Sequence, residues 1–147
     1  MKLGLGSYSY RWSIGHKDRT PSSPITCIEL LEVTSKLELD VLQIADNMPV
    51  HNIETQTLDQ LYRTAQKQGI NLEIGMQSFS TESIKLYLDI AQRLDARILR
   101  IALDGNDVGT SDDIIAKEFK NILPIAEKIN CKIAIENHFA FPSDRMA

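Results

Sequence analysis

The stretch KIAIENHF, residues 132–139, decides how this chain is expected to fold. It begins as an apolar, β-branched run, which is typical of a buried strand. The run then ends in Glu136, Asn137 and His138, three side chains that form hydrogen bonds or bind metal ions. The stretch therefore predicts a strand whose carboxyl end carries functional groups.

Four earlier segments share the pattern of this strand: a branched apolar residue, a variable residue, another Leu or Ile, and usually a small residue. They are LGLG from Leu3, LQIA from Leu42, LEIG from Leu72 and LRIA from Leu99. With IAIE from Ile133, successive segments start 27 to 39 residues apart. A TIM barrel averages about 31 residues for each of its eight βα units, so this spacing favours βα repeats.

Each gap between these segments contains apolar residues at helical intervals. The residues expected at helix boundaries are Ser23 with Pro24, Gly69, Ser80 or Thr81, and Ser111. Pro124 is expected to kink or divide the last helix. Strands that alternate with helices imply a parallel sheet, in either an open doubly wound fold or a barrel.

Side-chain alternation favours the barrel, because it places polar and small residues on the face opposite the helices. The first predicted layer of this face is Gly4, Gln43, Glu73, Arg100 and Ala134. Within it, we expect an ion pair between Glu73 and Arg100, with hydrogen bonds from Gln43. The next layer is Gly6, Ala45, Gly75, Ala102 and Glu136, so the Glu136 carboxylate should face a cavity lined by small residues. The predicted class is α/β, a partial TIM barrel of about five parallel strands and four helices, with residues 1–147 as one domain.

The motifs IAIENH, LQIADN, GINLEIG and LRIALDG together resemble strands of the xylose isomerase-like TIM barrels. This family comprises sugar isomerases, epimerases and endonuclease IV-type enzymes. IAIENH resembles its fifth-strand motif, in which the Glu is a divalent-metal ligand. The resemblance implies that Glu136 binds Mn²⁺, Mg²⁺, Zn²⁺ or Co²⁺ and takes part in catalysis in a complete protein. The other ligands have no counterpart, so we expect the chain to be the N-terminal portion of a longer protein and inactive alone.

The resemblance also implies a reaction, namely proton transfer between neighbouring carbons of a sugar or sugar phosphate through an enediolate. Three alternatives stay open. Glu136 could instead form a structural ion pair with Lys or Arg, the chain could be a non-catalytic half-barrel assembly module, or it could belong to an endonuclease IV-type hydrolase.

Substrate-binding candidates follow the predicted strands, because barrel enzymes place their sites at the carboxyl ends of the strands. They are Trp12, Tyr10, Asp46, Asn47, Gln77, Asp104 and His138. Trp12 is the preferred ring to stack on a sugar, whereas Tyr8 is expected to cover the open end of the barrel.

The composition limits the partners and the location. A net charge of −4 without a basic patch argues against nucleic-acid binding. Neither a signal-peptide apolar region nor a run of about 18 apolar residues is present, and Cys27 and Cys131 form no CxxC pair. We therefore expect a cytoplasmic protein that has no membrane partner. A small-molecule sugar as its substrate is what the resemblance implies. Unpaired sheet edges further predict self-association or a missing C-terminal half.

Overall fold

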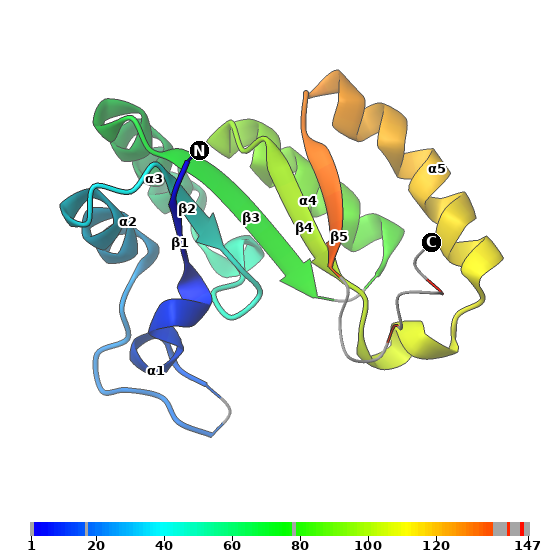
Figure 1. Ribbon diagram of the computed structural model, residues 1–147, viewed down its shortest axis with the longest axis horizontal. Helices are drawn as coiled ribbons and strands as arrows, with labels where there is room; N and C mark the ends of the chain where they lie inside the picture. Colours follow the sequence, from blue (N-terminus) through cyan, green and yellow to red (C-terminus); the bar gives the residue numbers. More distant parts are fainter. Residues whose placement is uncertain (1, 17, 78, 137–140, 142–144, 146–147) are drawn as a thin grey trace.

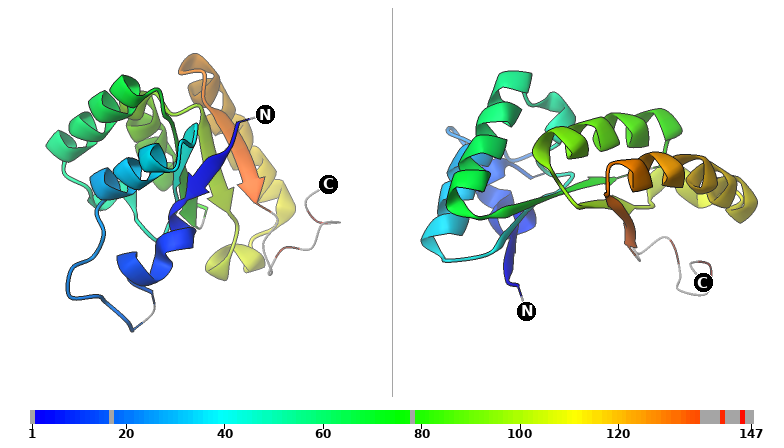
Figure 2. Two further views of the ribbon diagram at one scale, coloured as in Figure 1. Left: turned by 60° about the vertical axis from the view of Figure 1, so that its left-hand side comes forward. Right: turned by 90° about the horizontal axis from the view of Figure 1, so that it is seen from above.

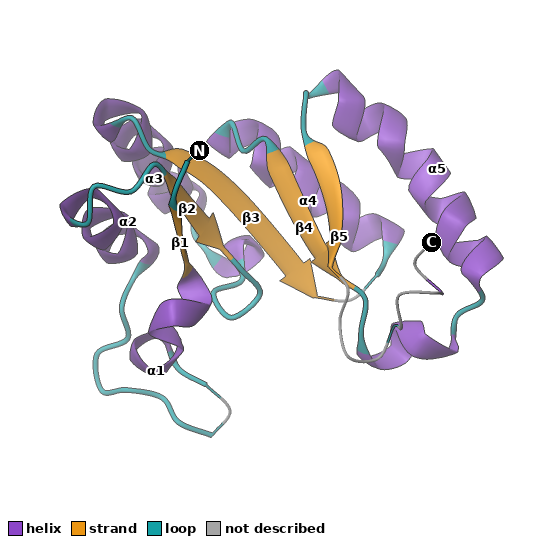
Figure 3. Cartoon of the chain, in the orientation of Figure 1, coloured by secondary structure: helices purple, strands orange, loops and turns teal. Residues whose placement is uncertain are grey.

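The computed structural model describes residues 2–16, 18–77, 79–136, 141 and 145 of the chain. The described strands are β1 (Gly4–Gly6), β2 (Val41–Ile44), β3 (Asn71–Gln77), β4 (Ile98–Ala102) and β5 (Lys132–Glu136). The α-helices are α1 (Arg11–Ile14), α2 (Cys27–Lys36), α3 (Thr55–Gln68), α4 (Thr81–Leu94) and α5 (Asp112–Lys128). Short 3₁₀ helices are η1 (Ser7–Tyr10), η2 (Val50–Asn52) and η3 (Gly105–Gly109). Apart from the additional short α1, this order confirms the predicted alternation of strands and helices (Figures 1 and 3).

The five strands form one parallel sheet in the order β1-β2-β3-β4-β5. Each strand therefore pairs with its neighbour in sequence, as a barrel requires and a doubly wound sheet does not. Seen from above, the long helices gather on one side of the sheet, while β1 and β5 turn towards the other side (Figure 2). The sheet is thus an open trough with helices on its outer face, which confirms the predicted partial TIM barrel.

The register between strands is staggered, and this corrects the predicted layers. Gln43 lies opposite Glu73, but Arg100 lies opposite Gly75, two residues further along β3. Gln43 donates a hydrogen bond to Glu73 at 2.9 Å, as expected. The expected ion partner of Glu73 is instead displaced towards the carboxyl ends of the strands. Tilted barrel strands require such a stagger, which alternation within one strand does not reveal.

The start of α2 differs from the prediction. Thr26, rather than Ser23, is the N-cap, and its hydroxyl accepts a hydrogen bond from the Glu29 amide. The Glu29 carboxylate accepts in return from the Thr26 amide at 2.8 Å, which completes a capping box. This reciprocal pair satisfies two amides that a helix start otherwise leaves without partners, so the helix begins there rather than beside Pro24.

The other helix boundaries agree with the sequence. Gly69 ends α3 in the left-handed conformation, with φ of 70°. The Ser80 hydroxyl accepts from the Ser83 amide at the start of α4, and Ser111 immediately precedes α5. Pro124 does not divide α5, which continues to Lys128.

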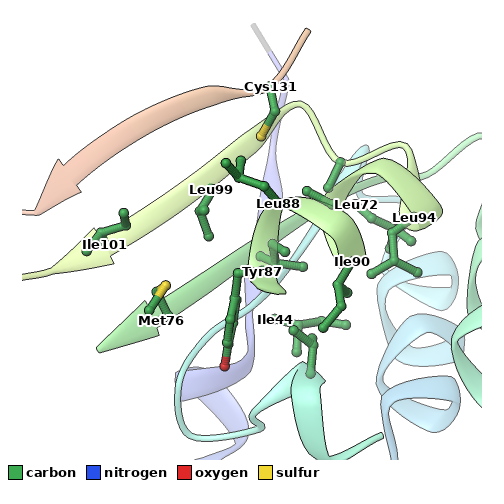
Figure 4. Close-up of a cluster of buried hydrophobic side chains, with 14 of the residues drawn as sticks. Ile44, Leu72, Met76, Tyr87, Leu88, Ile90, Leu94, Leu99, Ile101 and Cys131 are labelled. Carbon is green, nitrogen blue, oxygen red and sulfur yellow. The ribbon is translucent and has the colours of Figure 1, made fainter. Parts of the chain in front are cut away.

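The core lies between the sheet and its helices. Strand residues that are almost fully buried on this face are Leu42, Ile44, Leu72, Ile74, Leu99 and Ile101. Leu88 and Leu94 of α4 belong to the same buried cluster as these strand residues (Figure 4). Burying one such side chain contributes about 1.5–3 kcal/mol, so this face supplies most of the driving force for folding. No helix in the described part of the chain is both long and apolar enough to cross a membrane.

Candidate active site

A cavity of about 360 Å³ lies at the carboxyl ends of the strands. The described residues that line it are Tyr8, Asp46, Gln77, Arg100, Ala102 and Glu136. Tyr8 comes from η1 and Asp46 from the turn after β2, whereas the other four come from β3, β4 and β5. The lining thus combines charged and hydrogen-bonding groups from five consecutive strand–loop units, on the sheet face that the helices leave open.

Arg100 is the charged centre of this cavity. Its Nη2 donates to Oδ1 of Asp46 at 2.7 Å, and its Nη1 pairs with Oε2 of Glu136. The Arg100 side chain is only 18% exposed. From β4, one guanidinium therefore joins a carboxylate after β2 to a carboxylate at the end of β5. The ion-pair alternative for Glu136 is the arrangement that this structure shows.

Gly75 makes room for the guanidinium. It lies opposite Arg100 in the register of β3 and β4. A Cβ on Gly75 would lie 3.0 Å from Nε and 3.4 Å from Nη2 of Arg100. The small residue predicted to leave an open cavity therefore provides space for a side chain of the protein itself.

Tyr8 forms one wall of the cavity and contacts the same acidic group. Its hydroxyl donates to Oδ2 of Asp46 at 2.6 Å. Burial, reinforced by the hydrogen bond to Asp46 and by its negative charge, raises the pKa of Tyr8 to about 12. The phenol is consequently protonated at neutral pH and acts as a hydrogen-bond donor beside the cavity.

Behind Tyr8, the buried Ser7 connects the ends of β1 and β2. The Ser7 hydroxyl accepts from the Ala45 amide at 2.9 Å and donates to Oδ1 of Asn47. Nδ2 of Asn47 is buried and has no hydrogen-bond partner among the described residues. The position of Asn47 is thus that of a support for the first loop.

Gln77 connects the opposite wall of the cavity to the loop after β4. Its Nε2 donates to Oδ2 of Asp104 at 3.0 Å. Asp107, which is 4% exposed, accepts from the backbone amides of Phe79 and Asp104. These bonds hold the loops after β3 and β4 together and fix the orientation of Gln77.

The structure brings together only part of the predicted set. Glu136, Asp46 and Gln77 line the cavity, and Asp104 contacts it through Gln77. His138 lies outside the described residues.

The two aromatic candidates lie elsewhere. Trp12 is 57% exposed and lines a separate hollow with Arg19 and Pro21, where its ring meets that of His16 edge-on. Tyr10 packs against the hydrophobic core. In this arrangement Tyr8, not Trp12, is the aromatic residue at the cavity.

Two polar residues of the cavity lining, Tyr8 and Arg100, were missing from the predicted site. Tyr8 lies in η1, a 3₁₀ helix that directly follows β1, so the alternation of the strand does not extend to it. Arg100 was assigned to the correct face of the sheet but to the layer of Glu73, whereas it lies beside Gly75. A register between β3 and β4 was needed to find its partners.

The described residues alone do not fit a metal ion. Among them, no group of three or more His, Cys, Asp or Glu side chains is arranged to hold one. The two carboxylates among the described residues that line the cavity, Asp46 and Glu136, are both paired with Arg100. A metal site that includes Glu136 therefore requires further ligands and a different position for the guanidinium.

No family model matches the chain. A curated 3-oxo-isoapionate decarboxylase from Pectobacterium atrosepticum is 28% identical over 138 residues, which is 94% of this chain and 49% of that protein. A solved D-psicose 3-epimerase from Clostridium cellulolyticum, crystallised with D-tagatose, superposes with a TM-score of 0.66 over 90% of this chain, at 18% identity. The fold is that of the xylose isomerase-like TIM barrels. The chain spans about half the length of these proteins, 49% and 51% respectively.

A second solved structure adds a metal to the comparison. The IOLI protein with a bound zinc atom superposes on this half-barrel with a TM-score of 0.62, at 16% identity, covering 92% of this chain and 51% of that one. The likeness confirms the fold that the strand motifs predicted.

Proposed function

We propose that this half-barrel supplies one side of the active site of a sugar isomerase or epimerase. The observation that carries the proposal is the convergence of Glu136, Asp46 and Tyr8 on one cavity at the carboxyl ends of parallel strands. Barrel enzymes place their chemistry at this end. The likeness to D-psicose 3-epimerase supports a sugar as the substrate class.

In this proposal, Glu136 accepts a proton from a carbon next to the sugar carbonyl and returns it to the neighbouring carbon on the same face. In an epimerase, a second acid on the opposite face, supplied by the rest of the protein, would deliver the proton there instead. A carboxylate suits both steps, because it exchanges protons without leaving its position. The Tyr8 hydroxyl and the Gln77 amide line the same cavity and provide hydrogen bonds that orient sugar oxygens.

A divalent metal is a further part of the proposal for the whole protein. When bound, it would polarise the sugar carbonyl and stabilise negative charge on the oxygen. The zinc in IOLI supports a divalent metal in the whole protein, and the resemblance of the fifth-strand motif supports Glu136 as one of its ligands. The proton transfer by Glu136 described above uses only residues of this chain, since the described residues do not form a metal site.

The test uses a protein that contains this chain in its natural full length. It is incubated with ketohexoses in D₂O, and deuterium entering the sugar carbon is followed by NMR. Glu136→Gln should abolish the exchange. Glu32→Gln, which changes an exposed carboxylate on α2, should leave it intact. Exchange that persists in Glu136→Gln would contradict the assignment.

The curated relative favours a second candidate, the decarboxylation of an oxo sugar acid. Loss of CO₂ from a 3-oxo acid also produces an enolate, which then needs a proton, so the same carboxylate can serve either reaction. Release of CO₂ from a 3-oxo acid, without deuterium exchange into neutral ketoses, would favour this candidate over an epimerase.

We also propose that residues beyond those described, in the same chain or in a second copy, complete the site. The β5 edge supports this, because Ile135 is 42% exposed although its alternation matches that of the buried core residues of β4. Light scattering on residues 1–147 should show association. A monodisperse monomer at high concentration would rule out the second copy.

A further inference from the structure

The two carboxylate oxygens of Glu136 have different surroundings. Oε2 pairs with Nη1 of Arg100, whereas Oε1 forms no hydrogen bond or ion pair with any residue that the structure describes. We propose that Arg100 is a positioning residue, which holds Glu136 by Oε2 so that Oε1 is the atom that exchanges the proton with the substrate. This inference rests on the proposed function for the proton transfer, but not for the position of the side chain.

A group that positions another must itself be fixed, and Arg100 is held from two further sides. Its Nη2 donates to Asp46 at 2.7 Å, and Asp46 in turn accepts from the Tyr8 hydroxyl at 2.6 Å. On the β3 side, the space beside Gly75 is so narrow that an added Cβ would lie 3.0 Å from Nε. The place of the guanidinium is therefore set by contacts that do not involve Glu136.

Glu136, by contrast, depends on Arg100 for its position. It is the last residue of β5, an outer strand of the described sheet, and its side chain is 35% exposed. Glutamate is among the side chains with the most rotamer freedom to lose, so without a partner the carboxylate would occupy several positions. A misplacement of about 1 Å can reduce the rate of a reaction about 10²-fold. Holding Oε2 in place is thus a contribution to the rate.

The chemistry of arginine suits this role. Its guanidinium presents several donors in one rigid plane, so it can hold Asp46 and Glu136 at the same time. A lysine ammonium carries the same charge but has no such fixed fork.

Two other roles for Arg100 would leave different traces. In one, the ion pair serves only to attach β5, although such partly exposed pairs contribute little to stability. In the other, only the positive charge of Arg100 matters to the reaction, and lysine would replace it. Positioning alone requires the fork, so Arg100→Lys separates it from both alternatives.

The test uses the natural full-length protein, prepared with glutamate labelled with ¹³C at the γ carbon. The Glu136 signal is identified by its loss in Glu136→Gln. NMR relaxation should give an order parameter of about 0.85 for this carbon in the wild type, and below about 0.6 in Arg100→Gln and Arg100→Lys. In the deuterium-exchange assay, both variants should lose about 10- to 100-fold in kcat with little change in KM. Arg93→Gln, which removes an arginine from an exposed pair with Asp59, is the matched control and should alter neither readout.

A Glu136 side chain that is already disordered in the wild type, or equally ordered in Arg100→Lys, would overturn the proposal. Full kcat in Arg100→Lys would also overturn it, as would a raised KM with unchanged kcat, because Arg100 would then bind the substrate. If circular dichroism shows that Arg100→Gln is unfolded, Arg100→Lys carries both measurements. If the wild type exchanges no deuterium with any ketohexose, the proposed function fails, and the order of the Glu136 side chain still supports or rejects the positioning.

Discussion

The two faces of the sheet are built from alternate residues of the same strands, yet their side chains differ in kind. The helix face carries branched apolar residues, and Leu99 and Ile101 of β4 are fully buried there. Between them, Arg100 points to the open face and holds two carboxylates. One strand of five residues therefore serves both the core and the candidate site.

This difference teaches that stability and chemistry are separable at single positions. The helix face excludes water and gains free energy from burial. The open face retains charges that are partly solvated, with Glu136 35% exposed, and their pairing contributes little to stability. Substitutions on one face should thus affect one property and spare the other.

The largest expected effect is on turnover, from Glu136→Gln in the whole protein. Loss of a positioned acid–base group typically reduces the rate by about 10²–10⁴-fold. The free energy of unfolding should change by about 1 kcal/mol or less, because Arg100 retains Asp46. Steady-state kinetics and urea unfolding on the same preparation measure both quantities. A large loss of stability with unchanged kcat would mean that Glu136 serves the stability of the fold and not the chemistry.

The next effect is the converse, from Leu99→Ala on the helix face. Deleting a fully buried leucine side chain should cost about 2–5 kcal/mol of unfolding free energy, since it leaves a cavity against α4. Leu123→Ala, on the exposed side of α5, should cost less than about 1 kcal/mol. Urea denaturation measures both, and equal losses would mean that the helix face is not the main core.

The stability of the protein at alkaline pH should depend on two tyrosines, Tyr87 on the helix face and Tyr8 on the open face. Burial, together with the charge of Asp46, raises the pKa of Tyr87 to about 12, as it does for Tyr8. Unfolded tyrosines ionise near pH 10, so stability is complete below about pH 10 and falls as the pH rises towards 12.

The two phenols should contribute unequally. Tyr87 is 4% exposed and bonds to Nδ1 of His51, whereas Tyr8 is 41% exposed. Urea midpoints measured from pH 8 to 11.5 should therefore lose more of their pH dependence in Tyr87→Phe than in Tyr8→Phe. A pH-independent wild type would contradict the raised pKa values.

The smallest expected effect is on stability, from a substitution at Gly69, which lies at the end of α3 and belongs to neither face of the sheet. Gly69→Ala should cost about 1 kcal/mol, because a side chain is strained at φ of 70° and no heavy atom lies within 4 Å of the added Cβ. Gly109→Ala, equally uncrowded but without a positive φ, is its control. Similar values for both would show that the left-handed conformation of Gly69 is not decisive.

Alternation along a strand was enough to predict that Glu136 and Arg100 share the open face. Gly69 and Ser80 were also recognisable as helix boundaries, because their roles depend on local backbone geometry. The partners of Arg100 were not predictable in this way, since they depend on the two-residue displacement between β3 and β4. The position of Tyr8 in the cavity wall was not predictable from alternation, because Tyr8 lies in the 3₁₀ helix η1 and not in the strand, which ends at Gly6.

The Ser7 hydroxyl touches no cavity space, but the first loop depends on it for its attachment to β2. A survey of variants limited to the cavity lining would pass over this residue. Ser7→Ala would nevertheless remove the hydrogen bonds that attach the first loop to β2. The neighbouring Tyr8 would then be free to shift and change the shape of the cavity. A redesign of the cavity should therefore either retain Ser7 or change it deliberately in order to move Tyr8.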